Sequence, residues 1–187
     1  MPIFPFNPNM FETARLFLRP LNKDDTDAIF ALRRDAELMR FIREPQTKHA
    51  EAESWIKLIS SLWESEKIGF CAVIDKNSNE FIGWCGLWHL KETGETEVGY
   101  AIAENFQKKG FASEAAEKFL EYGFYQLNLE KIVAVARPEN KASRRVMEKI
   151  GMKYDGIGKY YDRDLAHYSI LRENFIATKR AMSEPSA

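Results

Sequence analysis

The chain has 187 residues and a formal net charge of -1, with 45% hydrophobic and 29% charged residues. These values are ordinary for one globular domain and favour neither general binding to nucleic acid nor attachment to an anionic membrane. The apolar runs are too short to span a bilayer, and residues 1–10 do not resemble a signal peptide. We expect one domain in the cytoplasm, with an extended arm at 1–11, a core at 12–175 and a tail at 176–187.

The first predicted elements are a strand and two helices. Residues 15–19 alternate in polarity like a strand with one wet face. Asn22 precedes a helix expected at 24–35, and a second helix is expected at 47–67. Apolar positions of the second helix recur at helical spacing, namely Trp55, Ile56, Ile59, Leu62 and Trp63.

Three strands are then expected at 70–75, 80–90 and 95–103, joined by hairpin turns at 77–79 and 92–94. Both cysteines, Cys71 and Cys85, fall within these strands, where a small buried thiol is the usual role. The sequence has no Cys/His spacing typical of a metal site, so no metal is expected.

The second half alternates helices and strands. Its expected elements are a helix at 111–126, a strand at 131–137, a helix at 141–150 and strands at 152–159 and 165–173. A meander flanked by helices and followed by a βαβ-like half predicts an α+β fold.

The segment between the third strand and its following helix is the strongest functional signal. A helix start offers free backbone N–H groups and a favourable dipole for an anion, and glycine lets the backbone approach a ligand. The segment therefore predicts a cradle for a diphosphate. Its members are Gln107, Lys108, Lys109, Gly110, Phe111 and Ala112.

Four motifs in order resemble the GNAT superfamily of acetyl-CoA-dependent N-acetyltransferases. Gln107 to Ala112 resembles its diphosphate loop, and Asn140 to Gly151 resembles its second cofactor motif. The resemblance covers about residues 12 to 175. It implies the GNAT fold, with a mixed, mostly antiparallel central sheet that is splayed at the cofactor site and flanked by helices.

The details resemble the branch that acetylates the N-terminal alanine or serine of ribosomal proteins. These details are Glu97-Val-Gly-Tyr100, Gly110-Phe-Ala-Ser-Glu114 and Asn140-Lys-Ala-Ser143. The resemblance implies acetyl-CoA as co-substrate and a primary amine as acceptor. This amine belongs to a protein N-terminus or to a small molecule. The resemblance is compatible with a monomer or a homodimer.

The resemblance also assigns roles in cofactor binding. Backbone groups of Tyr100, Ala101 and Ile102 would pair with the pantetheine arm, and the Asn140 side chain would bond its amide. A plain helix N-cap is the structural alternative for Asn140. Candidates for the nucleotide 3′-phosphate, with a solvated basic face as the alternative, are Arg137, Lys141, Arg144 and Arg145.

Acetyl transfer to an amine needs a base for the amine proton, and Glu97, just before the cofactor segment, is the first candidate. Glu95 lies on the same face of the strand, so either carboxylate could serve. His89 is the second candidate for this role, with a structural role as its alternative.

The proton donor to the leaving thiol is less well defined. Met147 stands where many GNAT enzymes have a tyrosine, and a methionine cannot donate a proton. Ser143 is the substitute that the resemblance offers, with backbone capping as its alternative. Tyr160, Tyr161 and Tyr168, on or beside the last strands, are further candidates.

The acceptor is left open. Residues 34–45 are expected to form one wall of its site, whereas Trp84 and Trp88 are expected in the core. Nearby Glu92 would favour a cationic amine. Three hypotheses remain: an acetyltransferase for a protein N-terminus, one for a polyamine or aminoglycoside, and an acyl-CoA-binding sensor without turnover.

Overall fold

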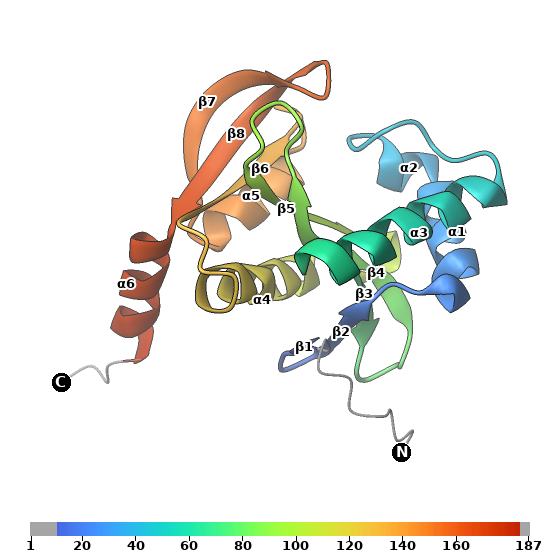
Figure 1. Cartoon of the computed structure of the whole chain (residues 1–187), viewed down its shortest axis with the longest axis horizontal. Coiled ribbons are helices and arrows are strands. Elements are labelled where there is room, and N and C mark those ends of the chain that lie inside the picture. The colour runs from blue at the N-terminus through green and yellow to red at the C-terminus, as the bar shows by residue number, and fades with distance from the viewer. Residues whose placement is uncertain (1–10, 184–187) are drawn as a thin grey trace.

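The computed structural model describes residues 11–183 and contains one eight-stranded sheet (Figure 1). The strands are β1 Phe11–Glu12, β2 Leu16–Pro20, β3 Gly69–Asp75, β4 Phe81–His89, β5 Thr96–Ile102, β6 Lys131–Ala136, β7 Lys153–Tyr160 and β8 Arg163–Leu171. Their order across the sheet is β1-β2-β3-β4-β5-β6-β8-β7. The predicted α+β class and the mixed sheet are confirmed.

Helices flank this sheet. They are α1 Thr26–Arg33, α2 Ala36–Met39, α3 His49–Glu66, α4 Phe111–Tyr125, α5 Lys141–Lys149 and α6 Arg172–Ser183. The predicted helix at 47–67 agrees with α3 to within two residues. The short α2 and β1 were not predicted, because four and two residues are too few to show a periodic pattern.

The sheet divides between β5 and β6. Every other neighbouring pair of strands is antiparallel, whereas β5 and β6 run parallel and share a single registered pair, Glu97 with Val133. Beyond this pair toward Ile102, the strands separate. The implied splay of the sheet is therefore present, and it lies at the segment expected to hold the cofactor.

The register of β4 and β5 decides which side chains share a face. Trp84 lies opposite Ala101 and Trp88 lies opposite Glu97, and residues opposite one another in antiparallel strands point to the same face. We call the side of Trp84, Trp88 and Glu97 the first face. Tyr100 has the other parity and points to the second face.

Different helices cover the two faces. On the first face, Trp55 of α3 packs against Trp84, with ring centroids 5.8 Å apart. On the second face, α4 lies close enough that a Cβ on Gly123 would meet Leu87 at 3.4 Å. The site thus has one wall from the N-terminal helices and another from α4 and α5.

The C-terminal part differs from the sequence prediction. The last strand ends at Leu171, and α6 follows from Arg172 in place of a strand end and a tail. Phe175 is buried and packs on Phe124, with ring centroids 5.2 Å apart, which holds the helix on α4. The segment 172–183 is mostly polar, so its sequence shows no periodic apolar face that would have predicted this helix. The predicted arm lies almost wholly outside the described residues.

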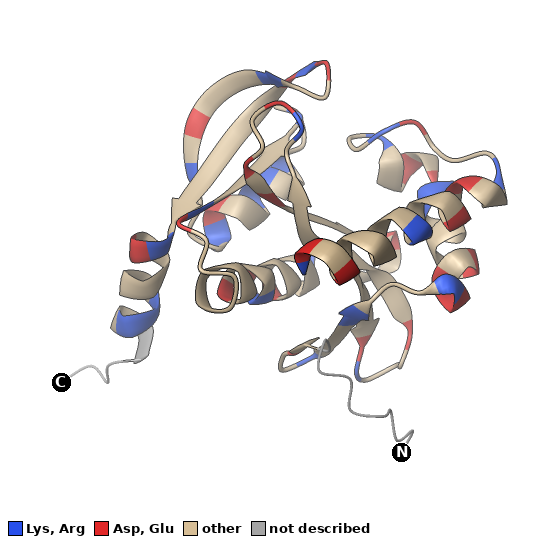
Figure 2. Ribbon diagram, viewed as in Figure 1, with Lys and Arg blue, Asp and Glu red and all other residues tan. Residues whose placement is uncertain are grey.

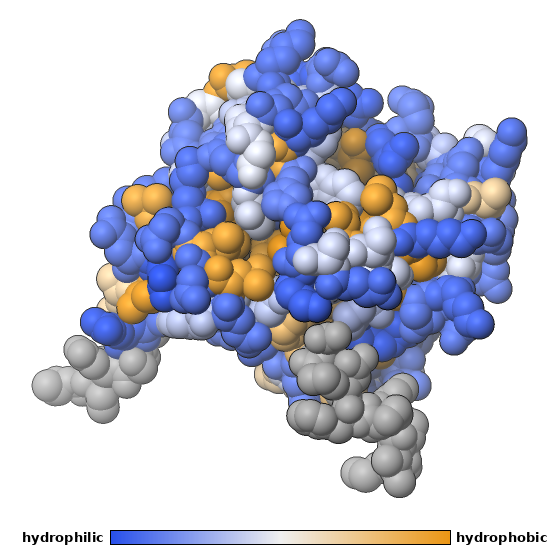
Figure 3. All heavy atoms as spheres, in the orientation of Figure 1, coloured by the Kyte–Doolittle hydropathy of each residue, from blue (hydrophilic) through white to orange (hydrophobic). Residues whose placement is uncertain are grey.

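The surface is mixed in charge. Figure 2 shows acidic and basic residues interspersed over the elements, and Figure 3 shows hydrophilic residues over most of the viewed face with hydrophobic ones gathered near its middle. Within residues 11–183, no helix is long and apolar enough to cross a membrane, and no cluster of metal-ligating side chains occurs. Cys71 and Cys85 are free and buried, as expected.

Candidate active site

The backbone of β5 presents open hydrogen-bonding groups where the sheet divides. Ladder bonds join Leu90 to Glu95 and Ala103 to Ile82, so odd-numbered residues of β5 direct their backbone toward β4. Tyr100 and Ile102 therefore direct theirs toward the gap beside β6. Tyr100 and the Ile102 N–H can pair with an extended cofactor arm, whereas the Ile102 carbonyl already accepts a bond from the Gln107 side chain. Ala101, predicted to do the same, instead turns its N–H and C=O toward β4.

The loop after β5 has the backbone conformation that the diphosphate cradle requires. Lys108 and Gly110 both have positive φ, 60° and 85°, and Gly110 is the N-cap of α4. Gly110 provides no side-chain cap, so the first N–H groups of α4, at Phe111 and Ala112, are left for a ligand. Gln107 acts differently from the expectation: its side chain donates to the Ile102 carbonyl at 2.9 Å.

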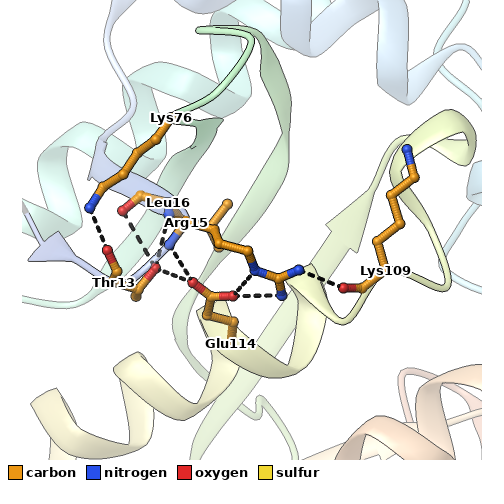
Figure 4. A network of polar contacts seen from close by, with 6 residues as sticks. All are labelled: Thr13, Arg15, Leu16, Lys76, Lys109 and Glu114. Carbon is orange, nitrogen blue, oxygen red and sulfur yellow. Dashed lines mark hydrogen bonds and ion pairs between the residues drawn. The ribbon is translucent and has the colours of Figure 1, made fainter.

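A network of polar contacts anchors this loop to the N-terminal turn (Figure 4). Arg15 donates to Glu114 from Nε at 2.7 Å and to the Lys109 carbonyl from Nη1 at 2.9 Å. Thr13 adds a 2.6 Å hydrogen bond to Glu114. Burial raises the pKa of Glu114, but the bonds from Thr13 and Arg15 outweigh it and lower that pKa overall. Glu114 thus stays ionised yet neutralised beside an anion site.

Two cations that the sequence did not single out border the loop. A Cβ built on Gly110 would lie 3.3 Å from Nη2 of Arg15 and 3.9 Å from Nζ of Lys149. Arg15 comes from the β1–β2 turn and Lys149 from the last turn of α5. Their positions depend on chain segments far from residue 110 in sequence, which is why the loop motif gave no sign of them.

The start of α5 meets β5 on the second face. The Asn140 side chain accepts a hydrogen bond from the Ser143 N–H at 3.1 Å, so the N-cap role holds and only its amide N–H₂ is left for a cofactor. The Tyr100 hydroxyl lies 3.0 Å from the Ser143 carbonyl and 3.1 Å from Ser143 Oγ. Met147 is buried. Ser143 therefore sits at the gap with a tyrosine hydroxyl beside it.

The basic residues of α5 divide into two groups. Arg144 donates to the Tyr168 hydroxyl at 2.9 Å and to the Pro138 carbonyl at 3.3 Å, so it is engaged in the structure. Tyr168 is fully buried and also bonds Glu148, which makes it a packing residue rather than a proton donor. The exposed candidates for the 3′-phosphate are Lys141 and Arg145.

Glu97 stands where β5 and β6 separate. Its carboxylate accepts a hydrogen bond from the Tyr161 hydroxyl at 2.7 Å and another from the Val135 backbone N–H. The Val135 N–H of β6 therefore bonds to this side chain, where a longer β5–β6 pairing would have bonded it to the β5 backbone. The side chain is 9% exposed, and this burial raises the pKa of Glu97 to about 7, against the two hydrogen bonds that lower it.

Tyr161 is the residue that sequence reasoning undervalued. It lies in the β7–β8 turn with φ of 51°, and its backbone N–H donates to Glu92 in the β4–β5 turn. Both turns lie together at the top of Figure 1. A long-range hairpin contact of this kind leaves no local pattern in the sequence. Tyr160 is engaged elsewhere, stacked on His167.

The other two candidate bases are occupied. Glu95 forms an ion pair with Lys131. Its burial raises its pKa, but bonds from Lys131 and Thr93 lower it below the usual value overall. His89 pairs with Glu66 at 2.7 Å on the exposed surface. Neither group combines the burial and the raised pKa that distinguish Glu97.

Aromatic side chains line the first face beside Glu97. Trp88 stacks on Phe70 with ring centroids 5.8 Å apart, and Phe70 lies 5.7 Å from Trp55. Trp84 is buried as expected, but Trp88 is only half-buried. In the segment 34–45, expected to line the acceptor site, the Ile42 carbonyl accepts a 3.3 Å bond from Arg163 of the β7–β8 hairpin, while Met39 belongs to the core.

Comparison with known proteins agrees with this arrangement. Residues 15–153 match the family model described as an acetyltransferase (GNAT) domain. A solved acetyltransferase of the GNAT family from Bacillus anthracis superposes with a TM-score of 0.74 at 28% identity, covering 88% of this chain and 99% of that chain.

Two sequence relatives support the same assignment. The uncharacterized N-acetyltransferase p20 of Bacillus licheniformis is 31% identical, over 87% of this chain and 96% of its own. Spermidine N(1)-acetyltransferase of Escherichia coli K12 is 28% identical, over 74% of this chain and 73% of its own. The divided sheet, the glycine-capped loop and these matches agree, and the chain belongs to the GNAT family of acetyl-transferring enzymes.

Proposed function

We propose that this enzyme transfers the acetyl group of acetyl-CoA directly to the N-terminal α-amine of a protein, with both substrates bound at once. The observation that carries the proposal is the buried Glu97 carboxylate at the point where β5 and β6 separate. A base with a pKa near the working pH is suited to take one proton from an amine of similar pKa.

Acetyl-CoA supplies an activated acetyl thioester, and the chain offers separate groups for its two ends. The diphosphate would lie on the N–H groups of Phe111 and Ala112, with Arg15 and Lys149 nearby as cations. The pantetheine arm would extend along the open backbone of Tyr100 and Ile102. Holding two reactants in line lowers the barrier by roughly 7–11 kcal/mol in ideal cases.

Glu97 takes the proton of the incoming ammonium group, so a neutral amine attacks the acetyl carbon. A nitrogen–carbon bond then forms as the carbon–sulfur bond breaks. The departing thiolate, whose conjugate acid has a pKa near ~8.5 by analogy with cysteine, needs only modest help. Ser143, with the Tyr100 hydroxyl at 3.1 Å, is the proton donor that we assign to it, and Ser143 regains its proton when the newly acylated nitrogen loses its second proton.

The choice of a protein N-terminus rests on charge. An N-terminal amine has a low pKa of ~7.7–8.0, which eases its deprotonation by a base such as Glu97. The first face also carries a cation, Arg33, which disfavours a polyamine. A small amine is the second candidate, supported by the similarity to the spermidine enzyme.

The test is thiol release from acetyl-CoA with N-terminal peptides, spermidine, an aminoglycoside and lysine as acceptors. We expect release with peptides, and a loss of about 100-fold or more in kcat/KM near pH 7 in Glu97→Gln, since a positioned base contributes roughly 10²–10⁴. The Glu97→Gln loss should shrink at higher pH, where the free amine is already deprotonated.

The matched control is Glu95→Gln. It removes the same charge from a residue that lies two positions before Glu97 and pairs with Lys131. Its kcat/KM should stay within a few-fold of wild type. Preference for spermidine would instead favour the small-amine acceptor. Acetyl-CoA binding without release by any amine would overturn the catalytic proposal in favour of a sensor.

A further inference from the structure

Arg33, the last residue of α1, is a buried cation that forms no ion pair with any residue in the described range 11–183. Its side chain is 3% exposed, and within residues 11–183 its Nε and Nη2 atoms have no hydrogen-bond partner. The guanidinium lies over the Trp55 ring at 4.1 Å and near the Trp84 ring at 5.7 Å. Glu51 is the carboxylate that acts on it electrostatically, but it makes no ion pair with it.

Packing explains only part of this arrangement. The two rings stabilise the flat face of the cation, and the C-terminus of α1 provides a favourable dipole. However, the donors of a guanidinium point outward along its edge, and a buried donor that is left unpaired loses its hydration without compensation. Arg43 adds repulsion, and with burial it lowers the pKa of Arg33 to about 10, which still leaves the group cationic.

A continuous aromatic surface joins Arg33 to the base. From Arg33 it passes over Trp55 to Phe70, and Phe70 stacks on Trp88, which lies opposite Glu97 in the sheet. Trp55, Phe70 and Trp88 are all only half-buried, so they present ring surface to a ligand. The first face therefore offers a cation at one end, rings between and a carboxylate at the other end.

The register sets the length of this surface. Trp84, beside Arg33, pairs with Ala101, whereas Trp88 pairs with Glu97. The two pairs are four residues apart along β5, which corresponds to about 13 Å at ~3.3 Å per residue. An α-carboxylate in the same amino acid lies too close to its amine to span this distance. An extended peptide covers it in roughly three or four residues.

Building on the proposed function, we propose that the acceptor carries an anionic group that pairs with Arg33 while its amine meets Glu97. For a protein acceptor this group is an acidic side chain at the third or fourth residue, with apolar atoms over Trp55 and Phe70. Arg33 is then a specificity-determining residue. A bidentate guanidinium–carboxylate pair satisfies the two orphan donors and adds recognition in a defined geometry.

The experiment uses the whole chain and hexapeptides with amidated C-termini that carry one glutamate at position 2, 3, 4 or 5, each matched by a glutamine peptide. We measure kcat/KM by thiol release and, separately, peptide affinity by calorimetry in the presence of CoA. We expect wild type to prefer glutamate over glutamine by about tenfold, with the preference greatest at position 3 or 4. Equal values at every position would overturn the inference.

The variant pair is Arg33→Gln with Arg34→Gln as control, because Arg34 follows directly, carries the same charge and is exposed. Arg33→Gln should abolish the glutamate preference, and Arg34→Gln should keep it. The readout is a ratio within each protein, so partial unfolding of a variant does not imitate the effect.

The two proposals fail separately. Binding that favours glutamate without turnover would refute acetyl transfer to peptides and leave the Arg33 pairing standing. Turnover of both peptides at one rate would support acetyl transfer and refute the pairing. A preference that survives Arg33→Gln would assign recognition to another cation and also refute it.

Discussion

Glu97 shows how one carboxylate can be prepared for proton transfer by its surroundings. Burial alone would disfavour its charge, while Tyr161 and the Val135 N–H moderate that effect, so the pKa settles at about 7. Glu95, two residues earlier in the chain, pairs with Lys131, and its pKa is lowered instead of raised. Position in the tertiary structure, rather than residue type, separates the proposed base from a carboxylate that is held in an ion pair.

Tyr161→Phe tests the moderating hydrogen bond. Removing the hydroxyl at 2.7 Å takes a donor from the ionised form of Glu97, so the pKa of Glu97 should rise further. The rising limb of the pH profile of kcat/KM should move to higher pH by about one unit, with near-normal rates at alkaline pH. The control, Tyr160→Phe, keeps its ring stacked on His167 and should leave the profile in place. A pH-independent loss in Tyr161→Phe would contradict this role.

At the scale of elements, the divided sheet and the capped helix act together. The single registered pair between β5 and β6 leaves strand backbone open, and the loop that follows turns into α4 with its first N–H groups free. The Arg15–Glu114 network fixes this loop against the β1–β2 turn. Under the proposed function, this short stretch of chain would provide both a strand edge and an anion site for one extended ligand.

Gly110→Ala tests the loop. The residue has φ of 85°, which strains an alanine, and a Cβ would lie 3.3 Å from Arg15 Nη2, so the Arg15 side chain must give way. We expect the KM for acetyl-CoA to rise roughly tenfold and the free energy of unfolding to fall by about 1 kcal/mol. Gly94→Ala is the matched control, since φ is 71° there and a Cβ would contact nothing. It should lose similar stability at unchanged KM; equal KM values in the two variants would refute the cradle.

For the whole molecule, the burial of Glu97 should reduce stability at the pH where it is useful. Its folded pKa of about 7 lies above the ordinary value of 4.5, so the folded state favours the protonated form. Stability is therefore unaffected by this group below about pH 4.5, falls as pH rises toward 7, and is reduced by about 3 kcal/mol beyond that.

Glu97→Gln should remove this penalty. Its free energy of unfolding, measured by urea titration and compared with wild type, should gain up to about 3 kcal/mol between about pH 4.5 and 8. Taking the difference in the free energy of unfolding between the two proteins removes the contributions of groups that titrate identically in both. A constant difference across this range would mean that the carboxylate titrates normally in the folded protein. The same substitution thus links lost activity with gained stability.

The sequence by itself determined the order of elements, the loop at Gly110, the capping position of Asn140 and Glu97 as first candidate base. These depend on local rules: period, turn residues and helix starts, which act over a few residues. Even so, α6 escaped prediction, because Phe175 on Phe124 and ion pairs from Lys179 to α4 hold it in place of a periodic apolar face.

Only the tertiary structure decided which of the predicted groups come together. It gave Glu97 its burial and its Tyr161 partner, tied Glu95 to Lys131, and set Arg33 over Trp55. Burial and pairing depend on segments distant in the chain, and these fix both pKa and specificity. For this reason, the chemistry could be proposed from the motifs, but a proposal for the acceptor needed the packed first face.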